Sequence, residues 1–115
     1  MSNYHEPVSE LSNETRDYVR ALNSLKEEIE AVDWYQQRVD TASDQQLKDV
    51  LAHNRDEEIE HACMTLEWLR RNMPGWDEYL RTYLFTSEHI TEIEEDEESD
   101  GKKRTDLGIG GLKHS

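Results

Sequence analysis

The 115-residue sequence has one cysteine, two prolines and five glycines. The single cysteine, Cys63, excludes an intramolecular disulfide, a CxxC metal site and a thioredoxin-type redox pair. No apolar run approaches the ~18 residues of a membrane span, and the first residues lack the basic region and apolar block of a signal peptide. We therefore expect a small cytoplasmic protein without a disulfide framework and without a membrane partner.

Apolar side chains and positive charges are also scarce. The hydrophobic fraction is 34%, whereas ~45–50% is usual on a scale that also counts glycine. Thirteen basic residues stand against 27 acidic residues, which gives a net charge of −14. Because an acidic surface repels phosphate, no nucleic-acid partner is expected. So short a chain with so thin a core is expected to associate with another copy of itself.

Glycine and proline are absent from the whole stretch between Val8 and Met73, which favours long helices. Its one weak point is a short run of polar residues that favours a turn. There Ser43 fits the first position of a capping box, and Asp44 is well placed for the helix dipole. We predict helices over residues 9–40 and 44–72, joined by a tight turn into an antiparallel hairpin.

A Pro74-Gly75 pair follows, and the amphipathic segment after it predicts a short third helix that ends near Thr86. The predicted fold is therefore all-α, with the hairpin and the short helix forming one domain over residues 1–90. Seven of the nine residues 92–100 are acidic. Like-charge repulsion there predicts a disordered acidic linker over residues 91–104.

Two polar residues interrupt the apolar spacing of the second predicted helix. Glu58 and His61 are three residues apart and share one face. An isolated buried carboxylate is costly and tends to take up a proton, whereas a metal cation removes that cost. Glu28, at the edge of the apolar stripe of the first helix, is about as far from the turn as Glu58. We expect Glu28 and Glu58 to face each other at one level.

A Glu-x-x-His motif on a bundle helix is half of a carboxylate di-iron ligand set. A symmetric dimer would supply Glu28, Glu58 and His61 twice around two metal ions. It would also bury apolar surface that the small core of one chain leaves exposed. The predicted hairpins thus complete a four-helix bundle by dimerisation. Two structural alternatives stay open: Glu58 pairs with Arg55 on a solvated helix, and His61 is an ordinary core histidine.

Further side chains on the first helix have two interpretations each. Glu27 and Glu30 lie on another face than Glu28 and form either a second, weaker cation site or a charged solvated surface. Trp34 and Tyr35 are by default core residues, although one lying near the metals would supply an electron or a hydrogen bond. Cys63 is expected to be a small buried apolar residue.

Four segments resemble the encapsulated ferritins of bacteria and archaea: EEIEAVDWY, LAHNRDEEIEHA, MTLEWLRRN and LRTYLFT, within residues 15–90. Residues 105–115 contain LGIGGLK, which resembles the cargo-loading peptide that docks proteins inside encapsulin shells. The resemblance implies a ferritin-like four-helix bundle with a di-iron ferroxidase centre across a dimer interface, and dimers assembled into a ring-shaped decamer. It also implies that Fe(II) is oxidised for iron mineralisation and storage inside the nanocompartment.

Matched residue by residue, the resemblance places the iron ligands at Glu28, Glu58 and His61. It places a metal-uptake site at Glu27 and Glu30. It sets Trp34 near the uptake path, Tyr35 close to the centre, and the shell contact at Leu107, Ile109 and Leu112. Two other functions stay open: a metal-free helical adaptor recruited to a shell, and a di-iron or di-manganese oxidase with an organic substrate.

Overall fold

The computed structural model describes the backbone of residues 4–106 and the side chains of residues 4–98. Within this range the chain forms helices and no strand. The elements are the short 3-10 helix η1 (Val8–Glu10) and the α-helices α1 (Asn13–Thr41), α2 (Gln45–Asn72), α3 (Trp76–Tyr83) and α4 (Ile90–Asp106). The chain divides into two compact units, Met1–Leu69 and Arg70–Ser115.

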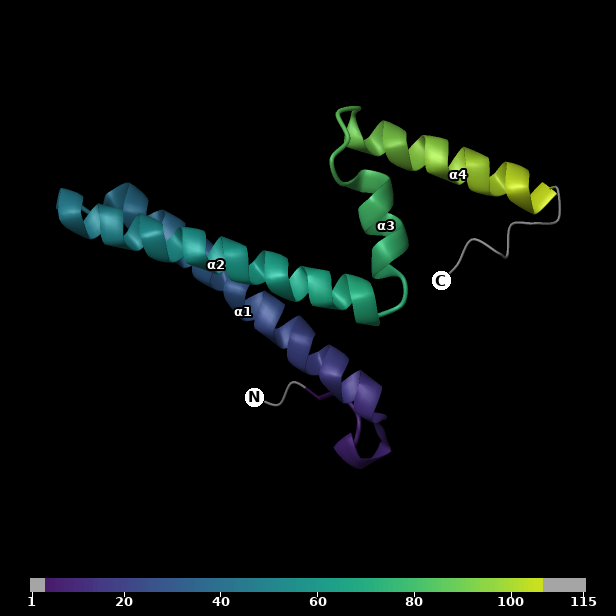
Figure 1. Ribbon diagram of the computed structural model, residues 1–115, viewed down its shortest axis with the longest axis horizontal. Coiled ribbons are helices and arrows are strands. Elements are labelled where there is room, and N and C mark those ends of the chain that lie inside the picture. The colour runs from purple at the N-terminus through teal and green to yellow at the C-terminus, as the bar shows by residue number, and fades with distance from the viewer. Residues whose placement is uncertain (1–3, 107–115) are drawn as a thin grey trace. The chain divides into compact units, whose positions relative to one another are not determined.

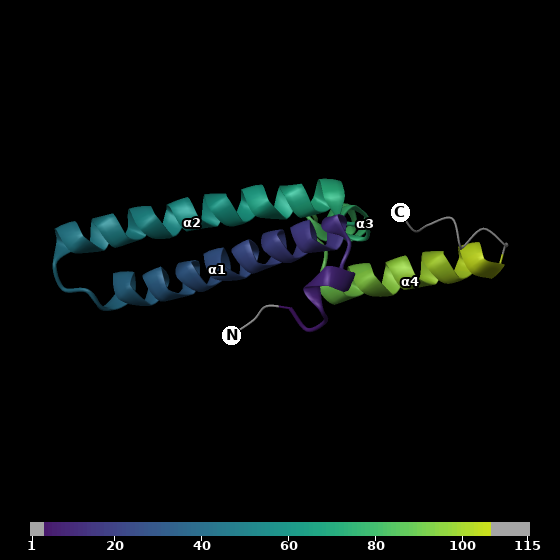
Figure 2. The ribbon, with the colours of Figure 1, turned by 90° about the horizontal axis from the view of Figure 1, so that it is seen from below.

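The first unit is built on the hairpin of α1 and α2, which run antiparallel and side by side (Figures 1 and 2). Ser12 caps α1, because its hydroxyl accepts a hydrogen bond of 3.1 Å from the backbone amide of Thr15. The all-α fold, the two-helix hairpin and the short third helix are therefore confirmed. None of the helices in the described range combines the length and apolar character needed to cross a bilayer.

The hairpin turn uses a different cap from the predicted one. The Asp44 carboxylate accepts a hydrogen bond of 2.9 Å from the Leu47 amide, and the Asp44 carbonyl accepts one of 3.0 Å from the Lys48 amide. Asp44 is thus the N-cap of α2, and the capping box starting at Ser43 is wrong. A carboxylate at this position satisfies an orphan amide and also interacts favourably with the helix dipole.

The core of the described part is small. Only Leu69 and Ile93 are buried among the side chains described. Large apolar side chains stay exposed along the hairpin: Ile29, Trp34, Leu47, Val50, Ile59, Met64 and Trp68. Two helices share one contact surface and leave their other faces open, so much apolar surface of the hairpin is left uncovered.

The second unit contains α3 and α4, which contact each other. The predicted disordered linker over residues 91–104 is wrong, because α4 is helical through this region. Glutamate is a good helix former, and Glu92 lies in the first turn, where negative charge is favourable. Ile93 is only 7% exposed, so burial of its apolar side chain also stabilises α4. Helix propensity and this burial outweigh the repulsion between like charges.

An acidic residue links the end of α2 to α3 within the second unit. The Asp77 carboxylate bonds to the guanidinium groups of both Arg70 and Arg81, the latter at 2.9 Å. These two hydrogen bonds, that of Arg70 first, hold the pKa of Asp77 below its usual value of 3.8. The stabilisation is therefore complete above that value and is lost as the pH falls through the lowered pKa.

Replacing the cap residue tests the turn. Asp44→Ala should lower the free energy of unfolding by about 1 kcal/mol, because an orphan amide loses its acceptor. Ser43→Ala is the matched control and should have little effect. Chemical denaturation of both variants at one protein concentration measures the difference. Equal losses of stability would mean that the Ser43 side chain contributes as much to the cap as that of Asp44.

The pKa of Asp77 gives a second test. An NMR titration of its carboxyl group should show a pKa below 3.8. Arg70→Gln should raise this pKa more than Arg81→Gln, since the bond to Arg70 is the larger cause of the shift. A pKa that neither substitution moves would mean that the two arginines do not hold the carboxylate in solution.

Candidate metal centre

Glu58 and His61 form a pair on one face of α2. The His61 Nδ1 atom lies 3.0 Å from Glu58 Oε1, as their spacing of three residues allows. Glu58 is the more covered partner, with 25% of its side chain exposed against 45% for His61. Arg55 instead donates to Gln36 at 2.9 Å and to Asp56 at 3.1 Å. The described contacts of Glu58 are therefore with the imidazole and not with a guanidinium group.

Glu28 carries the most informative carboxylate of the hairpin. Its Oε2 atom accepts a hydrogen bond of 3.3 Å from the Thr65 hydroxyl of α2. Its Oε1 atom is buried and has no hydrogen-bond partner among the described residues. A buried carboxylate oxygen without a partner is costly, and a cation would remove that cost. The residues present therefore fit a metal ion at this position.

The ligand set is incomplete within one chain. No group of three or more His, Cys, Asp or Glu side chains in the described part of the chain is placed to hold a metal ion. Glu28 meets Thr65, which follows His61 by one helical turn on α2. The meeting of Glu28 with Glu58 stays a prediction, since the described hydrogen bonds join Glu28 to Thr65 and Glu58 to His61.

The other predicted side chains differ in how far they are exposed. Glu27 and Glu30 are exposed on α1, and Trp34 is half exposed. Tyr35 is partly covered, with the Arg38 guanidinium 5.3 Å from the centre of its ring. The expectation of a buried Cys63 is wrong: this residue is exposed, about 140° around α2 from Glu58. Leu107, Ile109 and Leu112 lie outside the described residues.

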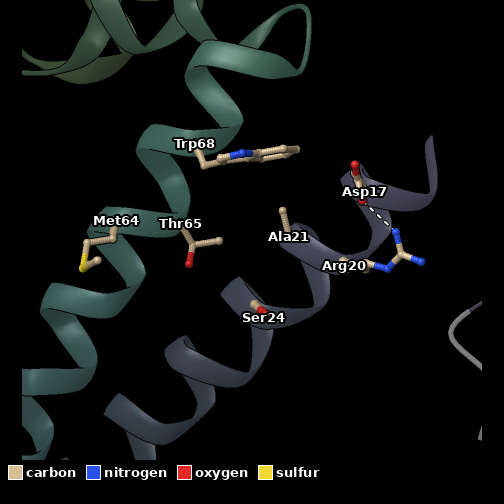
Figure 3. A pocket seen from close by; sticks show the side chains of 7 residues that line it. All are labelled: Asp17, Arg20, Ala21, Ser24, Met64, Thr65 and Trp68. Carbon is tan, nitrogen blue, oxygen red and sulfur yellow. Dashed lines mark hydrogen bonds and ion pairs between the residues drawn. The ribbon is translucent and has the colours of Figure 1, made fainter. Parts of the chain in front are cut away.

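A hollow of about 500 Å³ lies between the first half of α1 and the second half of α2 (Figure 3). Thr65 and Trp68 extend toward α1, where the small side chains of Ala21 and Ser24 leave room. The Trp68 ring also meets Tyr18 edge to face, with ring centres 6.4 Å apart. The sequence analysis did not predict the hollow.

The comparisons with known proteins give consistent results. The EncFtn-like family model matches residues 3–87. Over 111 residues the chain is 70% identical to the "Ferritin-like protein" of Thermotoga maritima, covering 95% of this chain and 96% of the other. Over 121 residues it is 54% identical to the "Encapsulated ferritin-like protein" of Rhodospirillum rubrum, covering 95% and 86%.

A solved structure agrees with the sequence comparisons. The crystal structure of a protein from Nitrosomonas europaea is similar with a TM-score of 0.75 and 58% identity, covering 77% of this chain and 98% of the other. The family match includes both helices of the hairpin, and with them Glu28, Glu58 and His61. The chain therefore belongs to the EncFtn-like family of encapsulated ferritin-like proteins.

Proposed function

We propose that this protein is a ferroxidase, which oxidises Fe(II) to Fe(III) at a centre shared by two copies of the chain. Two observations carry the proposal: the buried, unpartnered Oε1 atom of Glu28 on α1, and the Glu58–His61 pair on α2, which lacks a third ligand within the described part of the chain. Membership of a ferritin-like family supports iron as the substrate.

Two copies would supply the ligands that one copy lacks. Doubling Glu28, Glu58 and His61 gives four carboxylates and two imidazoles, the donor set of di-iron carboxylate proteins. Carboxylate and imidazole donors suit iron. Anionic oxygens stabilise Fe(III) more than Fe(II), because the electrostatic attraction grows with the charge of the ion. Bound Fe(II) supplies the electrons that reduce oxygen.

The residues of each chain then have separate tasks. The 3.0 Å separation of His61 Nδ1 and Glu58 Oε1 suits a hydrogen bond, and it also suits two ligands of one ion, which lie roughly 3 Å apart. Thr65 holds one oxygen of Glu28 and leaves the other for the cation. Tyr35, two turns along α1 from Glu28, would lie close to the centre.

Iron would reach the centre along the acidic surface. Glu27 and Glu30 are exposed one turn apart on α1, with Trp34 one turn further on. We assign the two carboxylates to metal uptake and Trp34 to the side of the uptake path. The net charge of −14 would raise the local concentration of Fe(II).

The same chain would act as cargo of an encapsulin shell, where its product feeds iron mineralisation and storage. The name of the Rhodospirillum rubrum relative supports an enclosed location. We propose that Leu107, Ile109 and Leu112 contact the shell and that dimers assemble into a ring-shaped decamer. Three aliphatic side chains give a few kcal/mol at most once the ordering of the segment is subtracted. Ten tails on one ring would bind far more tightly than one.

Substitution of the ligands tests the ferroxidase. Glu28→Gln and Glu58→Gln should each lower Fe(II) oxidation to near the uncatalysed rate, because they keep the volume of the side chain and remove its charge. Glu60→Gln is the control, since residue 60 is exposed and about 200° around α2 from Glu58. Stopped-flow absorbance of Fe(III) formation measures all three.

Full activity in Glu28→Gln would contradict the shared centre. Equal loss of activity in Glu58→Gln and Glu60→Gln would show instead that the reaction depends on the negative charge of α2 as a whole and not on the carboxylate beside His61. An unaltered chain that neither binds nor oxidises Fe(II) would favour a metal-free adaptor.

Deletion of residues 107–115 tests the location. The shortened protein should keep Fe(II) oxidation and its oligomeric mass, because α1 and α2 are intact, but it should no longer co-purify with shells. The nine residues fused to an unrelated oligomer should carry that oligomer into shells. Shortened protein that loads at the full-length ratio would place the address in the helical body.

A further inference from the structure

Thr65 makes a hydrogen bond across the hairpin, which is unusual for a threonine inside a helix. Such a threonine commonly donates its hydroxyl to the backbone carbonyl four residues earlier, as Thr41 and Thr82 do at 3.0 Å. The Thr65 hydroxyl instead crosses from α2 to α1 and donates to Glu28 Oε2 at 3.3 Å. Its side chain extends toward α1 at the edge of the hollow (Figure 3). The hydroxyl is thus committed to Glu28 and not to its own helix.

The two oxygens of the Glu28 carboxylate differ in what they contact. Oε2 accepts the hydrogen bond of Thr65, whereas Oε1 is buried and has no partner among the described residues. A carboxylate can bind a metal ion through one oxygen or through both. A hydroxyl that donates to Oε2 competes with the ion for the lone pairs of that oxygen. The hairpin therefore presents Glu28 to a cation through Oε1 alone.

We propose that Thr65 is a positioning residue that limits Glu28 to one metal-binding oxygen and thereby allows oxidised iron to leave the centre. The inference rests on the proposed function, in which Fe(III) is a product that passes on to a store. A carboxylate oxygen attracts Fe(III) more strongly than Fe(II), because the attraction grows with the charge of the ion. A second oxygen of Glu28 would therefore retain the product more than it would help the substrate to bind.

The sign of the effect separates this role from a purely structural one. Removal of the Thr65 hydroxyl leaves both oxygens of Glu28 without a donor, and a cation would relieve the cost of both. The proposed role therefore predicts tighter metal binding when the hydroxyl is lost. A hydrogen bond that only joins the two helices predicts the opposite result, because a looser hairpin would position its ligands less well and bind metal more weakly.

Substitution of Thr65 in the full-length protein tests the inference. Thr65→Val removes the hydroxyl and nearly keeps the volume of the side chain, whereas Thr65→Ser keeps the donor. Titration with Co(II) in the absence of oxygen, followed by its visible absorption, measures cation affinity apart from any oxidation. Thr65→Val should bind Co(II) roughly tenfold more tightly than the native chain, a size typical of one hydrogen bond to a charged group. Thr65→Ser should bind Co(II) as the native chain does.

Release of the product is measured with iron itself. Each protein is given Fe(II), oxidised in air and passed over a desalting column. Thr65→Val should oxidise the first addition at nearly the native rate, retain more Fe(III) per chain, and oxidise a second addition more slowly. Thr65→Ala removes the hydroxyl with a smaller side chain and should repeat these results, which covers the case in which valine disturbs the packing.

Thr82→Val is the matched control, because it makes the same change at a threonine that donates along its own helix. It should behave as the native chain in both measurements, and tighter Co(II) binding there as well would overturn the inference. Weaker or unchanged Co(II) binding in both Thr65→Val and Thr65→Ala would also overturn it. If the native chain still oxidises Fe(II), these results leave the proposed function standing. A native chain that does not oxidise Fe(II) would remove both.

Discussion

Two helices side by side can cover only one face of each other, and the rest of this protein follows from that limit. The described hairpin buries very little, and its apolar residues stay exposed along both helices. A chain with a hydrophobic fraction of 34% has no third α-helix in the described part of the hairpin unit to cover them. The proposed association would supply the second layer that a domain needs around its core. Polar residues in such a face, including Glu28 and His61, would then lie inside the assembly.

The cost of covering those polar residues decides the chemistry. A carboxylate enclosed between two hairpins must be protonated, paired or bound to a cation. In the hairpin, Glu28 already has one oxygen on Thr65 and the other buried without a partner. Glu58 has His61, a residue that can act as a ligand as well as a donor. Under the proposed function, a metal ion would satisfy these groups together, and assembly would be coupled to metal binding.

The helices could be predicted from the sequence because their signals are local. The absence of glycine and proline over residues 8–73, together with the spacing of apolar residues, gave both helices of the hairpin nearly to their ends. The choice of Asp44 over Ser43 as the N-cap depends on which side chain reaches a free backbone amide of α2. The two residues are adjacent and both are good caps, so the sequence pattern does not separate them. Helix α4 was not predicted because the repulsion between its acidic side chains was considered without the stabilising burial of Ile93.

The candidate site could be predicted only in part, for a geometric reason. The face shared by Glu58 and His61 follows from helical spacing, and the contact between them is observed. The expected meeting of Glu28 and Glu58 rests on backbone levels alone and stays a prediction. The direction in which each side chain leans also matters, and the described hydrogen bond of Glu28 is to Thr65. The exposure of Cys63 has a similar origin, since its position around α2 depends on which faces the neighbouring helix covers.

The acidic surroundings of His61 explain why the proposed dimer would respond to metal. Glu57 lies 3.6 Å from His53 and 3.9 Å from His61, all on one side of α2. In a dimer that shares the centre, the same residues of the second copy would approach them, so carboxylates of two acidic chains would come together. Repulsion between these carboxylates would oppose association. A bound cation would reverse the sign of that interaction and so couple association to metal binding.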